Sequence, residues 1–162
     1  MKKKPCQVYF YIRYKKILYA KPKGVFMKKV LIVDDEREYL LLFGEQLRTM
    51  GYSVVGAMNG KCAISMAKRE KPDVVMLDMM LPDMDGVSIA RNLKSDKETK
   101  NIPIIFVSGV YYTPENKDDA FEDASFILTK PVKMKELITV IGKLTSDIPN
   151  GMPPQGPFQC PA

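Results

Sequence analysis

Short apolar runs alternate with longer stretches of helical periodicity, and this alternation constrains the fold of the chain more than any other feature. The apolar runs are largely β-branched, as is typical of buried strands. They lie at residues 30–33, 54–57, 74–77, 104–107 and 126–128. Because a helix candidate follows each run, the pattern predicts an α/β fold with a five-stranded parallel sheet.

The expected helices carry apolar residues at spacings of three and four, which places those residues on one face. Two further helices are expected at residues 61–69 and from Thr113, with Thr113 as N-cap and Pro114 at the first helical position. The predicted buried faces are Leu40, Phe43, Leu47 and Met50 in residues 36–50, Val87, Ala90 and Leu93 after residue 86, and Leu137, Val140, Ile141 and Leu144 in residues 133–144.

Two terminal segments lie outside this alternation. Residues 1–26 hold eight Lys or Arg and no acid, and without them the net charge of +6 becomes −2, from 17 basic and 19 acidic side chains. We expect this basic extension to be disordered or a misassigned start, with Met27 opening the domain. Residues 147–162, rich in Pro and Gly, are expected to form a disordered tail. One domain over residues 27–146 remains.

Missing residue types narrow the possible chemistry. The chain has no histidine, which excludes Ser-His-Asp and Cys-His catalysis, His-ligated metals and a role as the histidine donor of a phosphorelay. The three cysteines, Cys6, Cys62 and Cys160, are far apart and lack metal-ligand spacing, so the expected location is the reducing cytoplasm. No apolar run approaches the ~18 residues of a membrane span.

Acidic residues follow two of the predicted strands. Asp34 and Asp35 come directly after residues 30–33, and Asp78 comes directly after residues 74–77. Because ligands of open parallel sheets bind at the carboxyl ends of the strands, the three carboxylates are expected to converge there and to repel one another. A hard divalent cation such as Mg²⁺, which prefers oxygen ligands, relieves that repulsion.

A hydroxyl and an amine follow the last two strands. Ser108 ends the fourth and Lys130 follows the fifth, so both are expected at the same crevice. Acids, a hydroxyl and a lysine together suit formation of an aspartyl phosphate, in which an ionised carboxylate attacks phosphorus without a separate base. Taken singly, each of these residues could be a cap, a turn residue or a surface side chain. Asp83 and Asp85 are expected to shape a loop rather than to bind metal.

Four motifs in this order resemble the receiver domain of two-component response regulators. They are VLIVDDE at 30–36, MLDMMLPDMDG at 76–86, IIFVSG at 104–109 and LTKP at 128–131, and the resemblance spans about residues 27–146. It implies a flavodoxin-like, doubly wound sheet of order 2-1-3-4-5 with helices on both faces. One motif alone would be weak, whereas four in order, each after a strand, are specific.

The resemblance also implies roles for individual residues. Asp78 would accept the phosphoryl group, and Ser108 and Lys130 would contact it. Asp34, Asp35 and Asp78 would bind Mg²⁺ together with the backbone carbonyl of Met79. The Lys130–Pro131 peptide bond is expected to be cis, as in that family.

The sequence departs from the family pattern at a few positions. Ile127 stands where many receivers carry an aromatic residue, with Phe126 beside it. An aromatic report of phosphorylation would therefore be weak, or would be relayed by Phe126 or by Tyr111 and Tyr112. Met80 and Val110 are apolar where a polar side chain could place an attacking water. We therefore expect a long-lived phosphorylated form.

Three functions follow from these observations. The first is a stand-alone switch, not an enzyme in the ordinary sense. It is phosphorylated by a sensor histidine kinase or histidine phosphotransfer protein and signals through protein contacts at its fourth helix, with a homodimer possible. The second is a receiver-like interaction module that works without phosphate. The third is a Mg²⁺-dependent phosphatase of the haloacid-dehalogenase type, which would need an acid where Met80 stands. Nucleic-acid binding by the domain itself is not expected, because no recognition module is present.

Overall fold

The computed structural model describes residues 28–109 and 123–145. Over these ranges the chain forms a parallel sheet of order β2-β1-β3-β4-β5, as the sequence and the family resemblance predicted. The elements are β1 (Lys29–Val33), α1 (Arg37–Thr49), β2 (Ser53–Ala57), α2 (Gly60–Glu70), β3 (Val74–Asp78), α3 (Gly86–Ser95), β4 (Ile104–Ser108), β5 (Phe126–Thr129) and α4 (Met134–Thr145).

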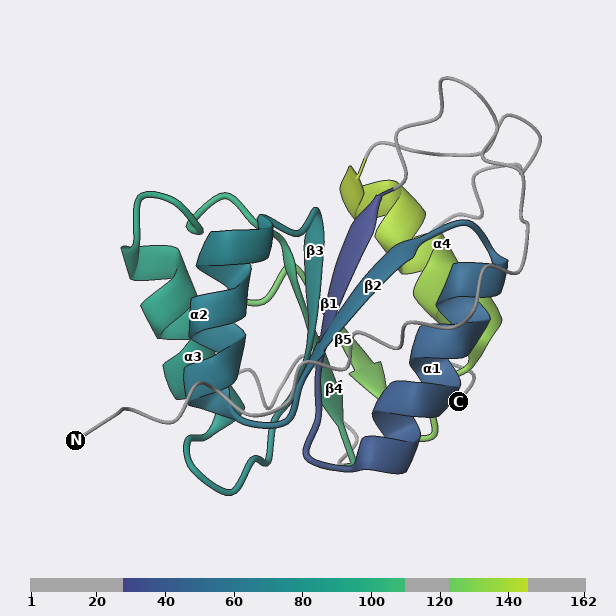
Figure 1. The fold of residues 1–162 in the computed structure, drawn as a ribbon, viewed down its shortest axis with the longest axis horizontal. Coiled ribbons are helices and arrows are strands. Elements are labelled where there is room, and N and C mark those ends of the chain that lie inside the picture. Colours follow the sequence, from purple (N-terminus) through teal and green to yellow (C-terminus); the bar gives the residue numbers. More distant parts are fainter. Residues whose placement is uncertain (1–27, 110–122, 146–162) are drawn as a thin grey trace, which may run out of the picture.

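Helices cover both faces of the sheet. In Figure 1, α2 and α3 lie on one side of the strands, and α1 and α4 lie on the other. Side chains alternate between these sides, so β1 sends Val30 and Ile32 toward α1 and α4, and Leu31 and Val33 toward α2 and α3. The central strands are buried on both faces, which explains why they read as continuous apolar runs.

Several sequence predictions of burial were wrong at the ends of elements. Met50 is half exposed because α1 ends before it, and Met50 is the C-cap residue. Phe126, predicted in a buried strand, is exposed because β5 is an edge strand and Phe126 is its first residue. Leu144 in the last turn of α4 is only half-buried, and in α3 Ile89 takes the buried place predicted for Val87.

The caps of two helices involve acids near the carboxyl end of β3. Asp85 is the N-cap of α3 and accepts hydrogen bonds from Ser88 N at 2.8 Å and Ser88 Oγ at 2.7 Å. Asp83 reaches the start of α2, where its carboxylate accepts from Gly60 N at 2.8 Å and Lys61 N at 3.2 Å. Both carboxylates therefore shape the loop, as predicted, and the loop is tied to α2.

Some of the expectations concern segments outside the described residues. These are the basic extension of residues 1–26, the tail of residues 147–162 and the helix expected to begin at Thr113. No helix in residues 28–109 or 123–145 is long and apolar enough to cross a bilayer.

Candidate functional site

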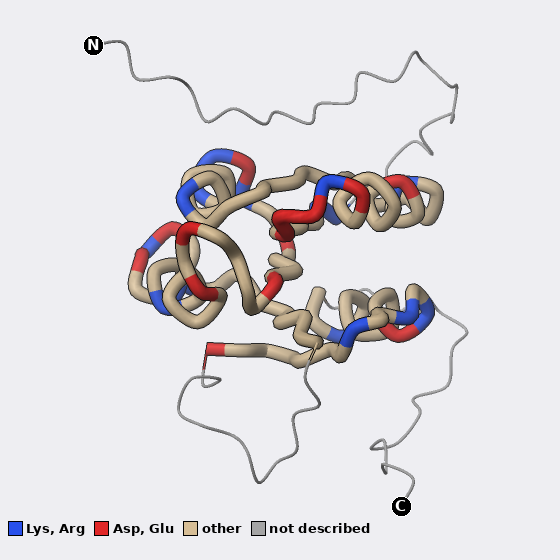
Figure 2. Tube along the Cα trace, turned by 90° about the horizontal axis from the view of Figure 1, so that it is seen from below, with Lys and Arg blue, Asp and Glu red and all other residues tan. Residues whose placement is uncertain are grey.

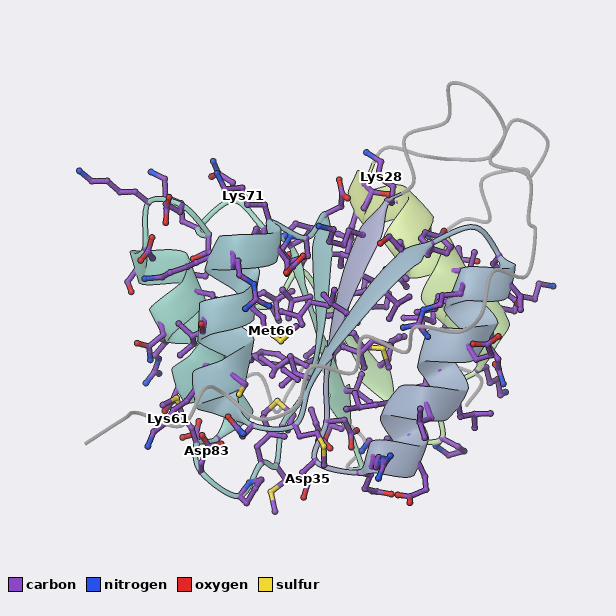
Figure 3. All side chains as sticks on the ribbon, viewed as in Figure 1. Lys28, Asp35, Lys61, Met66, Lys71 and Asp83 are labelled. Atoms are coloured by element: carbon purple, nitrogen blue, oxygen red, sulfur yellow. The ribbon has the colours of Figure 1, made fainter. Side chains whose placement is uncertain are left out.

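The residues singled out in the sequence lie at one edge of the sheet. Asp78 and Ser108 are the last residues of β3 and β4, while Asp34 and Lys130 directly follow β1 and β5. Parallel strands in register bring these ends together. Figure 2 looks onto this edge and shows acidic segments of the trace gathering between the two helix layers. In Figure 3 the same edge carries Asp35 and Asp83, and the opposite edge carries Lys28 and Lys71.

Three carboxylates form the acidic part of the site. Asp34 and Asp78 are buried, with 1% and 8% of their surface exposed, while Asp35 is exposed. One oxygen from each of the three lies within 4.8 Å of the others. Backbone amides fix two of them: Asp34 Oδ1 accepts from Glu36 N at 2.8 Å, and Asp78 Oδ1 accepts from Met80 N at 3.2 Å. The cluster is therefore held in place by its own loops.

Lys130 bridges the two buried acids. Its Nζ donates to Asp78 Oδ2 at 2.7 Å and to Asp34 Oδ2 at 3.0 Å. Burial acts against the charge of this ammonium, but the hydrogen bonds to Asp78 and Asp34 outweigh it and raise the pKa of Lys130. Burial likewise raises the pKa of Asp34, an effect that the Glu36 amide and Lys130 only partly offset. The ion pairs are partly buried and thus weakly screened by salt.

Ser108 and Met79 lie beside this bridge. Ser108 is buried, and its carbonyl accepts a 2.7 Å hydrogen bond from Lys130 N, which ties the ends of β4 and β5 together. The Met79 carbonyl accepts from Gly86 N at 2.9 Å. A Cβ on residue 86 would lie only 2.7 Å from the Asp78 carbonyl oxygen, so the close approach of α3 to this loop requires glycine. The Lys130–Pro131 peptide bond is cis, as expected.

One neighbour of the site was missed by sequence reasoning. Lys130 Nζ lies over the ring of Tyr39, 4.8 Å from its centroid, and that ring stacks on Phe43 with centroids 4.2 Å apart. Burial and the charges of Asp34 and Asp78 raise the pKa of Tyr39, so its phenol stays neutral. The only available signal was that Tyr39 falls in the first turn of the helix that follows the acid pair.

The arrangement suits a hard divalent cation and a phosphoryl group. Asp34, Asp35 and Asp78 provide the oxygen donors that Mg²⁺ prefers, and no described side chain near them offers nitrogen or sulfur of the kind that zinc favours. Lys130 holds a positive charge on the Asp78 carboxylate, where an anionic group would arrive. Such a site can stabilise negative charge on a transferred phosphoryl group.

Comparison with known proteins identifies the family. The sequence model of the response regulator receiver domain matches residues 30–142. The chain therefore belongs to the response regulator receiver family, the domain of two-component signalling that accepts phosphoryl groups.

Individual relatives agree with this assignment. The chain is 34% identical over 115 residues to Protein PilH of Pseudomonas aeruginosa, which covers 71% of this chain and 95% of PilH. It is also 34% identical over 117 residues to Response regulator PleD of Caulobacter vibrioides, covering 72% of this chain but only 26% of PleD. A solved structure of a putative response regulator from Chloroflexus aurantiacus matches at 27% identity and a TM-score of 0.68, over 75% of this chain and 99% of that one.

Proposed function

We propose that this receiver accepts a phosphoryl group on Asp78 from a sensor histidine kinase or a histidine phosphotransfer protein in a Mg²⁺-dependent reaction. It then signals through phosphorylation-dependent protein contacts. The observation that carries the proposal is the buried Asp78 carboxylate, which is paired with Lys130 at 2.7 Å and lies in one oxygen cluster with Asp34 and Asp35. A carboxylate so placed is a nucleophile with its charge compensation already present.

In the proposed reaction an Asp78 carboxylate oxygen attacks phosphorus in line with the bond to the donor nitrogen. The new O–P bond forms as the N–P bond breaks, and the electron pair of that bond returns to the imidazole nitrogen of the donor. Lys130 donates a hydrogen bond to an equatorial oxygen of the phosphoryl group, and the Ser108 hydroxyl donates to another. The protein contributes position and charge. Because the acceptor carboxylate is its own Asp78, the chain is itself the phosphorylated product.

Asp34, Asp35 and Asp78, with the carbonyl of Met79, would hold Mg²⁺, which offsets negative charge on the phosphoryl oxygens when it is bound. The support is chemical: three carboxylate oxygens converge, and two of the carboxylates are buried. A carbonyl oxygen has two lone pairs, so the hydrogen bond from Gly86 N leaves Met79 able to bind a cation.

The output is proposed to be a protein contact made differently in the two states. Ile127, at the position where many receivers carry an aromatic residue, is half-buried and packs on the core beneath α2 and α3, whereas Phe126 is exposed. Phe126 is thus the aromatic side chain of β5 that a partner can reach. Cytoplasmic location, a homodimer and the limits of the domain at residues 27 and 146 belong to the same proposal.

The test is phosphorylation of the whole chain by a small donor. The protein is incubated with Mg²⁺ and acetyl phosphate or phosphoramidate, and intact mass is measured for wild type, Asp78→Asn and Asp83→Asn. Asp83 is the matched control, because it is an acid of the same loop whose oxygens serve only backbone amides in the structure. We expect one phosphate adduct on wild type and on Asp83→Asn, and none on Asp78→Asn.

Other outcomes would favour other functions. An adduct retained in Asp78→Asn would move the acceptor elsewhere. Continuous release of phosphate from added esters would favour a phosphatase. No adduct with either donor, and none with a mixture of sensor kinases, would leave a module that works without phosphate as the better interpretation.

A further inference from the structure

The ring of Tyr39 is a third contact of the Lys130 ammonium, in addition to the two carboxylates. Among the described residues, three groups touch Lys130 Nζ: Asp78 at 2.7 Å, Asp34 at 3.0 Å and the Tyr39 ring, whose centroid is 4.8 Å away. The ring is itself held, since it stacks on buried Phe43 at an interplanar angle of 25°. Lys130 therefore contacts both a negative pair and a fixed aromatic face.

Only one of these three contacts is independent of a metal ion. Asp34 and Asp78 belong to the oxygen cluster that suits Mg²⁺, so a bound cation competes with Lys130 for the same two carboxylates. A divalent ion in that cluster also repels the ammonium. The face of a tyrosine ring attracts an ammonium through its quadrupole and is no ligand for a hard cation.

We propose that Tyr39 is a positioning residue for Lys130, holding the ammonium beside the acid cluster when Mg²⁺ takes the carboxylates from it. This inference rests on the proposed phosphoryl transfer for its consequence, but not for its geometry. With the ring in place, Lys130 stays within reach of an arriving phosphoryl oxygen. Without it, the ammonium loses its last fixed contact and swings toward solvent on its flexible stem.

The hydroxyl of Tyr39 takes no part in this role. Within the part of the chain that the structure describes, Tyr39 Oη is the buried side-chain polar atom that has no hydrogen-bond partner. A buried hydroxyl without a partner lowers stability, so its removal should be neutral or stabilising. The ring and the hydroxyl can thus be separated: Tyr39→Phe keeps the aromatic face, and Tyr39→Leu removes it while remaining apolar.

The first experiment observes Lys130 directly, with no phosphoryl donor present. The ε-methylene protons of Lys130 are assigned by NMR in labelled protein and followed during titration with Mg²⁺. Protons over a ring face resonate upfield, so we expect the Lys130 signals to lie upfield of those of other lysines before and after saturation with Mg²⁺ in wild type and in Tyr39→Phe. In Tyr39→Leu the upfield shift should be absent at every Mg²⁺ concentration, because the ring that causes it is gone.

The second experiment measures the rate of phosphorylation by phosphoramidate at saturating Mg²⁺. Loss of a partly desolvated cation–π contact should slow Tyr39→Leu roughly fivefold, with Mg²⁺ affinity unchanged. Tyr39→Phe should restore the wild-type rate. Tyr52→Leu is the control for core damage, because Tyr52 packs on the same hydrophobic cluster as Tyr39. It should lower stability without moving the Lys130 signals.

Two results would overturn the proposal. One is a Lys130 signal in wild type that joins the other lysines once Mg²⁺ is bound, and the other is a Tyr39→Leu rate equal to that of wild type. Failure of the proposed function is distinguishable from these: a wild type that takes no phosphate but keeps Lys130 upfield in Mg²⁺ refutes the phosphoryl transfer and supports the role of Tyr39.

Discussion

The backbone amide of Gly86 donates a 2.9 Å hydrogen bond to the carbonyl oxygen of Met79, joining the first residue of α3 to the loop behind Asp78. Alanine at this position would place a Cβ 2.7 Å from the Asp78 carbonyl oxygen and 2.9 Å from Met79 Cα, both backbone atoms that cannot rotate away. We expect Gly86→Ala to lower the free energy of unfolding by about 2 kcal/mol and to weaken Mg²⁺ binding.

Urea denaturation and Mg²⁺ titration check this expectation. Gly56→Ala is the matched control, because a Cβ on Gly56 would meet Leu40 side-chain carbons at 3.6 and 3.7 Å and the Ile32 carbonyl oxygen at 4.0 Å, all ordinary contact distances. A Gly86→Ala protein as stable as Gly56→Ala, with unchanged Mg²⁺ affinity, would show that the loop has room to relax.

Asp34 is expected to lower stability in the absence of a cation. Its carboxylate is 1% exposed, and burial raises its pKa, so keeping it ionised costs free energy. Asp34→Asn should therefore stabilise the metal-free protein by on the order of 1 kcal/mol, since Lys130 keeps Asp78 as its partner. Thermal unfolding measures the effect.

The same variant should respond differently to Mg²⁺. A ligand that binds only the folded state raises the melting temperature of wild type as its concentration exceeds Kd. Asp34→Asn lacks one buried carboxylate charge, so Mg²⁺ should raise its melting temperature only slightly. Equal rises in melting temperature in both proteins would remove Asp34 from the proposed ligand set. Asp73→Asn is the control, because Asp73 is a partly buried acid that pairs with Lys28 at the opposite edge of the sheet.

The loop acids should make the protein sensitive to acid. Hydrogen bonds from Gly60 N to Asp83, and from Ser88 to Asp85, lower the pKa of both carboxyls below 3.8. A pKa lowered in the folded state means that this stabilisation is complete above the unfolded pKa and is lost as the pH falls through the folded pKa. Asp83→Ala and Asp85→Ala should each lower the free energy of unfolding by about 1 kcal/mol at pH 7. This loss of stability should become smaller below pH 3.8.

Denaturation at a series of pH values measures that trend. Asparagine at either position keeps an acceptor oxygen but does not titrate, so Asp83→Asn and Asp85→Asn should show a smaller deficit at pH 7 and a flatter pH profile. If the loss of stability in the alanine variants does not change with pH, the carboxylate charge contributes nothing to the free energy of unfolding.

Met80 is expected to protect the aspartyl phosphate from water. It follows Asp78 by two residues, its side chain is 81% exposed, and its amide holds Asp78 Oδ1 at 3.2 Å. An amide side chain there could hydrogen-bond an attacking water, so Met80→Asn should speed the loss of phosphate roughly tenfold, the effect of about one such hydrogen bond. Decay of the phosphorylated mass after removal of the donor gives the rate.

Met50→Asn is the control for adding an amide to an exposed position, since Met50 is also exposed but caps the far end of α1. Equal lifetimes of the phosphate in wild type and Met80→Asn would contradict the shielding role.

The site was predictable from sequence to the extent that it depends on strand ends. Asp78 and Ser108 close runs of apolar residues, and the pairing of parallel strands then brings their ends together whatever the helices do. Tyr39 was not predictable in this way, because its contact with Lys130 depends on how α1 is rotated against the sheet. Sequence periodicity gives the buried face of a helix but not which side chain borders a pocket.

The errors in burial have the same origin. Phe126 and Leu128 look alike in a short apolar run, and what separates the exposed residue from the buried one is that Phe126 is the first residue of the edge strand β5, whereas Leu128 lies inside it. Met50 continues the helical spacing of α1 beyond the residue where the helix ends. Periodicity describes the middle of an element well and its ends poorly.

The hydrogen bond from Lys130 to Asp34 joins residues 96 positions apart. Asp34 and Asp78 are synthesised well before the lysine that neutralises them, and Lys130 reaches them only after β5 has added to the edge of β4. A nascent or truncated chain that ends before β5 would contain all three acids and no ammonium to compensate them. Under the proposed function, competence to accept the phosphoryl group would therefore coincide with completion of the sheet.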